Sequence, residues 1–148
     1  MASKNKSNKY VKYIKLVTDG GCRGNPGPGA IAIIIRDGDS NDVLAHYSAC
    51  IGHTTNNQAE YHALIRGLDM SAKYTRKKVI CMLDSNLVVK QMNGLWRLKN
   101  DQLRALYHEV KRNENPFEEV VYQHCRRTHQ FIKKADWMVN EAFEGRTF

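Results

Sequence analysis

Two segments that favour β-structure flank the stretch Thr18-Asp19-Gly20-Gly21-Cys22-Arg23-Gly24-Asn25-Pro26-Gly27-Pro28-Gly29. Before it, residues 13–18 mix apolar and polar side chains, and after it residues 30–35 are nearly all apolar. Glycine and proline tolerate turn geometry. The sequence therefore predicts a first strand that Asp19 closes, a turn over residues 21–29, and a second strand that runs back beside the first.

The rest of the chain predicts one more short strand and then an alternation of helices and strands. Residues 43–51 form a third extended segment after turn residues at 36–42. A helix follows Thr54-Thr55-Asn56-Asn57, which can cap it, because apolar residues recur at helical spacing: Ala59, Ala63, Leu64, Leu68 and Ala72. Later segments predict a strand at 78–83, helices at 85–92 and 102–111, a strand at 120–125, and a helix from about 135 to 144.

This order, β-β-β-α-β-α-α-β-α, predicts an α/β fold with one mixed sheet and helices on both of its faces. A chain of 148 residues with 42% hydrophobic residues has the size of one globular domain. Residues 1–10 are rich in Lys, Asn and Ser and predict a flexible basic tail. We therefore expect a single domain over residues 11–148.

The net charge favours a polyanionic partner. Lys and Arg number 23 against 15 Asp and Glu, a formal charge of +8, which favours nucleic acid first and an anionic membrane second. The basic start is not followed by the apolar run of a secretory signal, and no stretch approaches the roughly 20 apolar residues that span a bilayer. We expect a soluble, cytoplasmic protein. Its four separated cysteines predict reduced thiols, since they form no C-x-x-C pair.

Four acidic residues lie where predicted elements begin or end: Asp19, Glu60, Asp84 and Asp136. Asp84 follows the fourth strand, Glu60 lies one turn into the first helix, and Asp136 opens the last helix. If the first and fourth strands are neighbours, Asp19 and Asp84 lie side by side in the crevice at the ends of the strands. Capping and turn formation alone can explain Asp19, Asp84 and Asp136 individually, and they explain Glu60 less well.

Carboxylates that lie this close repel each other unless a cation joins them. Oxygen ligands suit Mg²⁺ or Mn²⁺, and a pair of such ions can hydrolyse a phosphodiester. The residues alone leave two classes open, a phosphoryl-transfer enzyme and a basic binding module.

The stretch at residues 18–29 closely resembles the first strand and turn of type 1 ribonucleases H. Three further segments resemble that family in the same order: Thr54-Thr55-Asn56-Asn57-Gln58-Ala59-Glu60, then Leu83-Asp84-Ser85-Asn86 leading into Val88-Val89-Lys90-Gln91, and then Ala135-Asp136 ahead of Asn140-Glu141-Ala142. Each of the four segments supplies one acid. The resemblance covers residues 14 to about 145 and implies the ribonuclease H-like fold, with five strands in the order 3-2-1-4-5.

The resemblance also implies the site and its cofactors. Asp19, Glu60, Asp84 and Asp136 fall on the family's metal-binding carboxylates, which hold two Mg²⁺ ions, and Mn²⁺ can substitute. The partner implied is an RNA–DNA hybrid, with neither a membrane nor an obligate protein partner. Short polar side chains can reach ribose 2′-hydroxyls across a shallow groove, and the matching positions are Cys22, Asn25, Thr55, Asn56, Asn57 and Asn86. Asn56 and Asn57 can instead serve only to cap the helix.

The chain departs from the family after the third carboxylate. Many bacterial members carry a protruding helix and loop rich in Lys and Trp there, whereas residues 91–99 run almost directly into the next helix. Trp96 and Asn100 can still line a channel for the DNA strand, along with Arg97 and Lys99, although Trp96 can equally be a core residue. The lysines of the tail, at positions 4, 6, 9 and 12, can add affinity for phosphates.

The loop before Asp136 is the second departure, because the family often places a mobile, proton-carrying histidine there. His129 is the candidate, since a histidine titrates near neutral pH. His124 lies in the predicted strand and is expected to be structural. A zinc site of His124, Cys125 and His129 is a further option that lacks a fourth ligand.

Together these residues predict an endonuclease that cuts the RNA strand of RNA–DNA hybrids with two metal ions and leaves 5′-phosphate and 3′-hydroxyl ends. The alternative is a catalytically weak domain on the same fold that binds hybrids or RNA. A transposase or junction-resolving domain is a third reading, which would require longer insertions around the acids.

Overall fold

The computed structural model describes residues 10–148, so the predicted basic tail lies almost wholly outside the described residues. Nine elements follow one another along the chain: β1 (Tyr13–Cys22), β2 (Gly27–Asp37), β3 (Val43–Thr54), α1 (Asn56–Ser71), β4 (Lys78–Leu83), α2 (Asn86–Met92), α3 (Asp101–Asn113), β5 (Glu119–His124) and α4 (Gln130–Phe143). This order matches the one that the sequence predicts. None of the helices in the described part is long and apolar enough to cross a membrane.

The strands form one mixed sheet in the order β3-β2-β1-β4-β5, as the family resemblance implies. β1 pairs antiparallel with β2 and parallel with β4, and β4 pairs parallel with β5. Because β1 and β4 are parallel neighbours, their carboxyl ends lie at the same edge of the sheet. The condition for bringing Asp19 and Asp84 together is therefore met.

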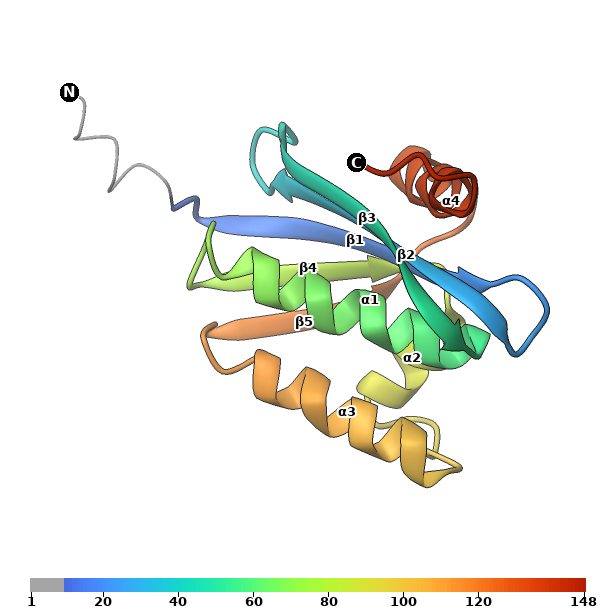
Figure 1. The fold of residues 1–148 in the computed structure, drawn as a ribbon. Helices are drawn as coiled ribbons and strands as arrows, with labels where there is room; N and C mark the ends of the chain where they lie inside the picture. Colours follow the sequence, from blue (N-terminus) through green and yellow to red (C-terminus); the bar gives the residue numbers. More distant parts are fainter. Residues whose placement is uncertain (1–9) are drawn as a thin grey trace.

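Helices cover both faces of the sheet, with α1, α2 and α3 on one face and α4 alone on the other (Figure 1). The position of β2 between two apolar cores explains why its sequence is almost continuously apolar. Ile31, Ile33 and Ile35 point into the core beneath α1, whereas Ala30, Ala32 and Ile34 point into a second core beneath α4. A strand that is buried on both faces needs apolar residues at every position, and the alternation typical of a half-exposed strand disappears.

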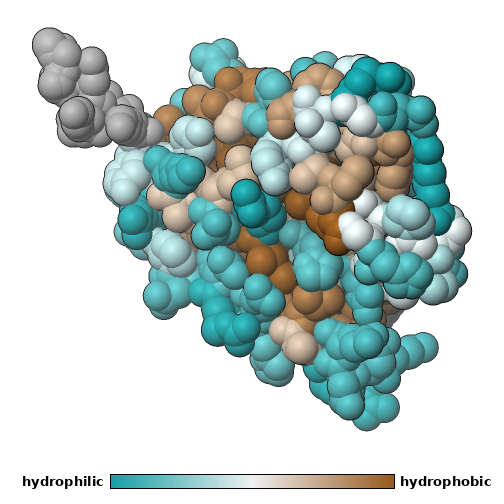
Figure 2. Space-filling view, in the orientation of Figure 1, coloured by the Kyte–Doolittle hydropathy of each residue, from teal (hydrophilic) through white to brown (hydrophobic). Residues whose placement is uncertain are grey.

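The face of the molecule that carries α1 and α3 shows hydrophilic residues with apolar patches between them (Figure 2). The largest fully buried side chains lie in the two cores that the sheet separates.

Two element boundaries next to the acids differ from the prediction. β1 continues to Cys22, so Asp19 lies within this strand and does not close it, and the turn shortens to residues 23–26. Gly20 and Gly21 pair with Ile31 and Ala30 in the sheet. α4 begins at Gln130, so Asp136 lies in its second turn and does not open it. Ile132 already belongs to the apolar face of this helix, which explains the earlier start.

Candidate active site

Three carboxylates meet at the edge where β1 and β4 lie side by side. Asp19 lies in β1, Asp84 directly follows β4, and Glu60 lies in the second turn of α1. Each offers an oxygen atom, and these atoms all lie within 4.8 Å of one another. The structure thus brings together three of the four acids that the sequence singles out.

Glycine at position 20 allows α1 to bring Glu60 next to Asp19. A Cβ at Gly20 would lie 2.3 Å from the carbonyl oxygen of Ala59 and 2.9 Å from the backbone nitrogen of Glu60. Both distances are far inside van der Waals contact, so any larger residue would push the helix away from β1. The role of this glycine, which sequence reasoning did not predict, is to let a helix backbone approach a strand.

Thr55 positions the start of α1. It is the N-cap, its hydroxyl accepts a hydrogen bond from the Gln58 backbone N–H at 3.2 Å, and Gln58 completes a capping box. Asn56 and Asn57 are the first two helical residues, so the reading that they cap the helix is wrong. The cap is formed by Thr55, so neither asparagine side chain is needed for it.

Burial and mutual repulsion make the acids of the cluster hold protons more tightly. Burial first, and then the charges of Asp84 and Asp136, raise the pKa of Asp19 from 3.8 to about 8. Burial and the charge of Asp19 likewise raise the pKa of Glu60 well above its ordinary value. Glu60 Oε1 is buried and has no hydrogen-bond partner among the described residues. A cation placed among these oxygens would relieve the repulsion and give this atom a partner.

The donor set fits a hard divalent cation. It consists of carboxylate oxygens only, which suit Mg²⁺ and Mn²⁺ better than zinc. Within residues 10–148, Asp19, Glu60 and Asp84 are the His, Cys, Asp or Glu side chains that gather closely enough to hold an ion. His124, Cys125 and His129 do not gather in this way, so the zinc reading has no support.

A cavity of about 400 Å³ opens over the three carboxylates. Asp136 lines it from α4, although it is exposed and lies outside the 4.8 Å cluster. Its charge still contributes to the raised pKa of Asp19. Asp136 therefore belongs to the same site as a more distant member.

Arg127 is a site residue that was not predicted from the sequence. Its Nε donates to Asp84 Oδ2 at 3.1 Å, and its side chain is 88% exposed and lines the cavity. The Arg127 charge opposes, in part, the rise in the pKa of Asp19 and Glu60. The signal for it is the pair of arginines, Arg126 and Arg127, that follows the last predicted strand.

His129, the candidate proton carrier, lies at the N-cap of α4 and not in an open loop. Its Nδ1 accepts a hydrogen bond from the Phe131 backbone N–H at 3.2 Å, and its ring lies 6.2 Å from that of Phe131. It is half-buried and is not among the residues that line the cavity. His124 ends β5 with an exposed side chain.

Several predicted groove residues gather where the β1–β2 turn meets α1. The Cys22 backbone N–H donates to Asn56 Oδ1 at 2.9 Å, and the Asn56 backbone N–H donates to Asn25 Oδ1 at 3.1 Å. Cys22, Asn56 and Asn57 also line the cavity. These bonds fix the turn against the helix and place polar groups at the border of the site.

The remaining predicted groove residues lie further out. Asn86 is exposed as the first residue of α2, where Ser85 forms the N-cap. Trp96 is 48% exposed, so the reading of Trp96 as a core residue is wrong. Asn100 is the N-cap of α3, and its Oδ1 accepts from the Leu103 backbone N–H at 2.8 Å. None of these three residues lines the cavity.

Comparison with known proteins matches most of the chain to one family. A family model described as "Reverse transcriptase-like" matches residues 17–142. The "Bifunctional protein Rv2228c" of Mycobacterium tuberculosis is 36% identical over 132 residues, which are 89% of this chain and 36% of that protein. The "Ribonuclease HI" of Halobacterium salinarum is 35% identical over 126 residues, which are 85% of this chain and 62% of that protein. The chain spans less than two thirds of the length of either relative.

A solved structure of a ribonuclease H1 is also similar to this chain. LC11-RNase H1 in complex with an RNA/DNA hybrid has a TM-score of 0.80 to this chain at 36% identity, over 89% of this chain and 97% of that one. The chain belongs to the type 1 ribonuclease H family. Its five-stranded sheet and helical layers are those expected of a type 1 ribonuclease H.

This ribonuclease H family member has a short connection where many bacterial members have a protrusion. The described residues 93–100 pass from α2 to α3 without a helix between them. A buried glutamine fixes this connection: Gln91 Nε2 donates to the Arg97 carbonyl oxygen at 3.1 Å, and Gln91 Oε1 accepts from the Tyr61 hydroxyl at 2.7 Å. The departure predicted from the sequence is therefore confirmed.

Proposed function

We propose that this ribonuclease H family member is an endonuclease that hydrolyses the RNA strand of RNA–DNA hybrids and leaves 5′-phosphate and 3′-hydroxyl ends. The observation that carries the proposal is the convergence of Asp19, Glu60 and Asp84 within 4.8 Å. Two Mg²⁺ ions are the proposed cofactors, with Mn²⁺ able to replace them. When bound, such cations polarise the phosphodiester and make water a better nucleophile.

The proposal gives each acid a place in the chemistry. Asp19 within β1 and Asp84 directly after β4 lie close together and would hold the cations. Glu60 reaches them from α1 and also contacts the 2′-hydroxyl of the substrate. Asp136 completes the second cation position from α4. These side chains come from backbone that the sheet and its helices fix, so little reorganisation is needed during the reaction.

Arg127 adds a positive group on the α4 side of the proposed site. A guanidinium carries five N–H donors, and the bond to Asp84 uses the one on Nε. The remaining donors can bind a phosphate oxygen as the substrate enters. We retain His129 as a candidate proton carrier.

Recognition of RNA is proposed for the polar groups at the border of the cavity. A 2′-hydroxyl is present on RNA alone, and it both donates and accepts hydrogen bonds. Cys22, Asn56 and Asn57 line the cavity with groups able to meet it. Asn25, Thr55 and Asn86 are proposed as further contacts outside the cavity. Trp96, in the connection between α2 and α3, and Asn100, at the N-cap of α3, are proposed to contact the DNA strand.

Cleavage of labelled substrates tests this proposal. The protein is incubated with an RNA–DNA hybrid, an all-DNA duplex and an all-RNA duplex, with Mg²⁺ or with Mn²⁺, beside Asp84→Asn and the control Asp69→Asn, an exposed acid on α1. We expect hybrid-only cutting that Asp84→Asn abolishes and Asp69→Asn leaves unchanged. Tight hybrid binding without cutting under either metal would instead support the binding module.

A further inference from the structure

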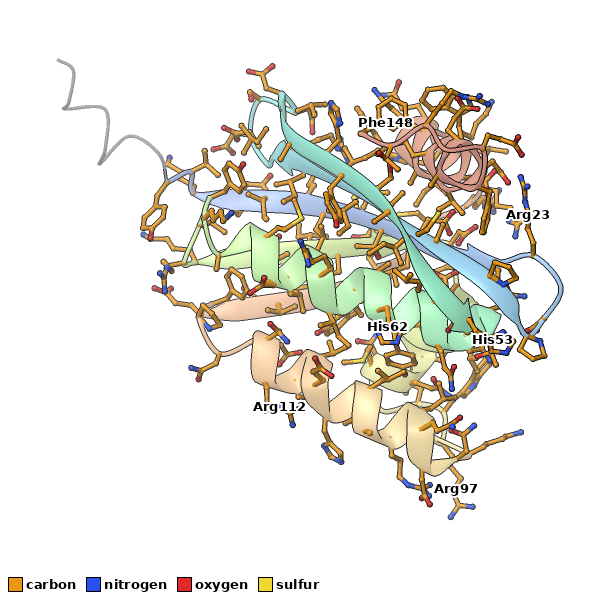
Figure 3. All side chains as sticks on the ribbon, viewed as in Figure 1. Arg23, His53, His62, Arg97, Arg112 and Phe148 are labelled. Atoms are coloured by element: carbon orange, nitrogen blue, oxygen red, sulfur yellow. The ribbon has the colours of Figure 1, made fainter. Side chains whose placement is uncertain are left out.

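Arg23 lines the same cavity as Arg127 and is not explained by the carboxylate chemistry. It follows β1 in the turn before β2 and points toward the C-terminal end of α4 (Figure 3). Its Nη1 lies 3.0 Å from Glu144 Oε2, and its guanidinium lies 4.6 Å from the centre of the Phe143 ring. Arg23 and Phe143 both line the cavity.

The ion pair between Arg23 and Glu144 is a weak structural link. The two side chains are 52% and 50% exposed, and exposed pairs contribute little to stability because water screens them. Glu144 is also the C-cap of α4, where the helix dipole disfavours a negative charge. An anion from solution can therefore replace this carboxylate at little cost, while Phe143 keeps the guanidinium oriented through its ring face.

We propose that Arg23 binds a backbone phosphate of the RNA strand, and that Glu144 holds the guanidinium until this phosphate replaces it. The inference rests on the proposed function, which places the RNA strand in the cavity. Strands rise about 3.3 Å per residue, so the Cα of Arg23 lies roughly 13 Å along the chain from that of Asp19. Arg23 therefore meets a phosphate that neighbours the scissile one and leaves the scissile phosphate to the carboxylates.

This role predicts opposite effects for the two members of the ion pair. Removing the guanidinium weakens hybrid binding, because one phosphate contact is lost. Removing the charge of Glu144 strengthens binding, because the competing carboxylate is gone. A purely structural link between the turn and α4 would instead make both changes act in the same direction.

Binding is measured by fluorescence anisotropy with a short labelled RNA–DNA hybrid, with every variant in the Asp84→Asn background so that the hybrid stays intact. We expect Arg23→Ala to weaken binding about threefold to tenfold and to lower the slope of log affinity against log salt by about one. Arg23→Lys keeps the slope and loses part of the affinity, since an ammonium lacks the planar fork. Glu144→Gln raises the affinity about twofold to threefold at low salt.

Arg146→Ala is the matched control. Arg146 is also an exposed arginine at this end of α4 that pairs with a glutamate, Glu141, but it does not line the cavity. We expect its affinity and salt slope to equal those of the parent. Thermal unfolding of each variant identifies any loss of folding, which the exposure of Arg23 makes small.

A hybrid series with one neutral methylphosphonate at successive RNA linkages then identifies the phosphate. One linkage should weaken binding of the parent and have no further effect on Arg23→Ala. Unchanged affinity and slope in Arg23→Ala, or weaker binding in Glu144→Gln, would overturn the inference while cleavage by the Arg23-containing protein still supports the proposed function. If that protein neither binds nor cuts the hybrid, both the proposed function and the inference fail.

Discussion

Neutralising Asp19 should stabilise the metal-free protein, and the gain should grow with pH. Asn has nearly the shape of Asp and carries no charge, so Asp19→Asn removes the repulsion at the centre of the carboxylate cluster. Asp19 is only 8% exposed, and burial together with Asp84 and Asp136 raises its pKa from 3.8 to about 8. The folded protein therefore holds this proton more tightly than the unfolded chain does.

The sign and size follow from this difference in proton affinity. Between about pH 4 and pH 8 the folded state binds more protons than the unfolded state, so the free energy of unfolding of the wild type falls as the pH rises through this window. A rise from 3.8 to about 8 is a change of roughly ten-thousandfold in proton affinity, which sets a ceiling of about 6 kcal/mol. Water entering the exposed cavity relieves part of the cost, so we expect Asp19→Asn to gain about 2–4 kcal/mol at pH 8.

Urea unfolding in EDTA at about pH 5 and pH 8 measures this gain, with Asp69→Asn as the control for loss of an exposed acid. The advantage of Asp19→Asn over the wild type should be small at the lower pH and large at the higher one. Addition of Mg²⁺ at the higher pH should stabilise the wild type and leave Asp19→Asn almost unchanged. An advantage that does not depend on pH, or a wild type that is the more stable protein at pH 8 without metal, would refute the electrostatic reasoning.

Three further predictions concern other residues of the site. Gly20→Ala should lower the free energy of unfolding by about 3 kcal/mol and abolish cleavage, because its Cβ would meet the Ala59 carbonyl. Gly21→Ala, whose Cβ has ordinary contacts, should cost far less in urea unfolding. Equal costs for the two variants would contradict the close approach of α1 to Gly20 as the cause. Arg127→Ala should tighten Mg²⁺ binding in calorimetry, since the guanidinium that pairs with Asp84 is gone, and should raise the KM for the hybrid. Weaker Mg²⁺ binding would show that Arg127 does not compete with the metal. His129→Asn should keep the cap of α4, whereas His129→Ala should lose it at a cost of about 1 kcal/mol in stability. If His129 carries protons, both variants lower kcat. A fully active His129→Asn would limit this residue to capping.

The sequence was sufficient for the sheet and for the members of the carboxylate cluster. Apolar runs such as residues 30–35 mark strands buried on both faces, and the strand at 78–83 was predicted at its observed bounds. Asp84 could be placed because a strand end followed directly by a helix start is visible as a change of hydrophobic period. The order of the strands and the joining of the four acids required the family resemblance, since spacing alone does not bring distant residues together.

The details that the sequence did not predict share a physical cause. Position 20 requires glycine because of its close approach to Ala59, which is 39 residues away in the chain. Arg127 and Arg23 owe their positions to partners on other elements, Asp84 and Glu144. Local propensity does not contain such contacts, and so it found the acids but missed the arginines that flank them.

The separate core beneath α4 makes the molecule divisible. The loop of residues 125–129 connects this helix to the sheet, and the helix packs through its own apolar face onto Val17, Ala32 and Ile34. Three carboxylates stay with the larger piece, whereas Asp136, Phe143 and Glu144 travel with the helix. A chain cut in this loop would therefore give two fragments that restore a full complement of site residues only when they meet, which is the design of a split reporter.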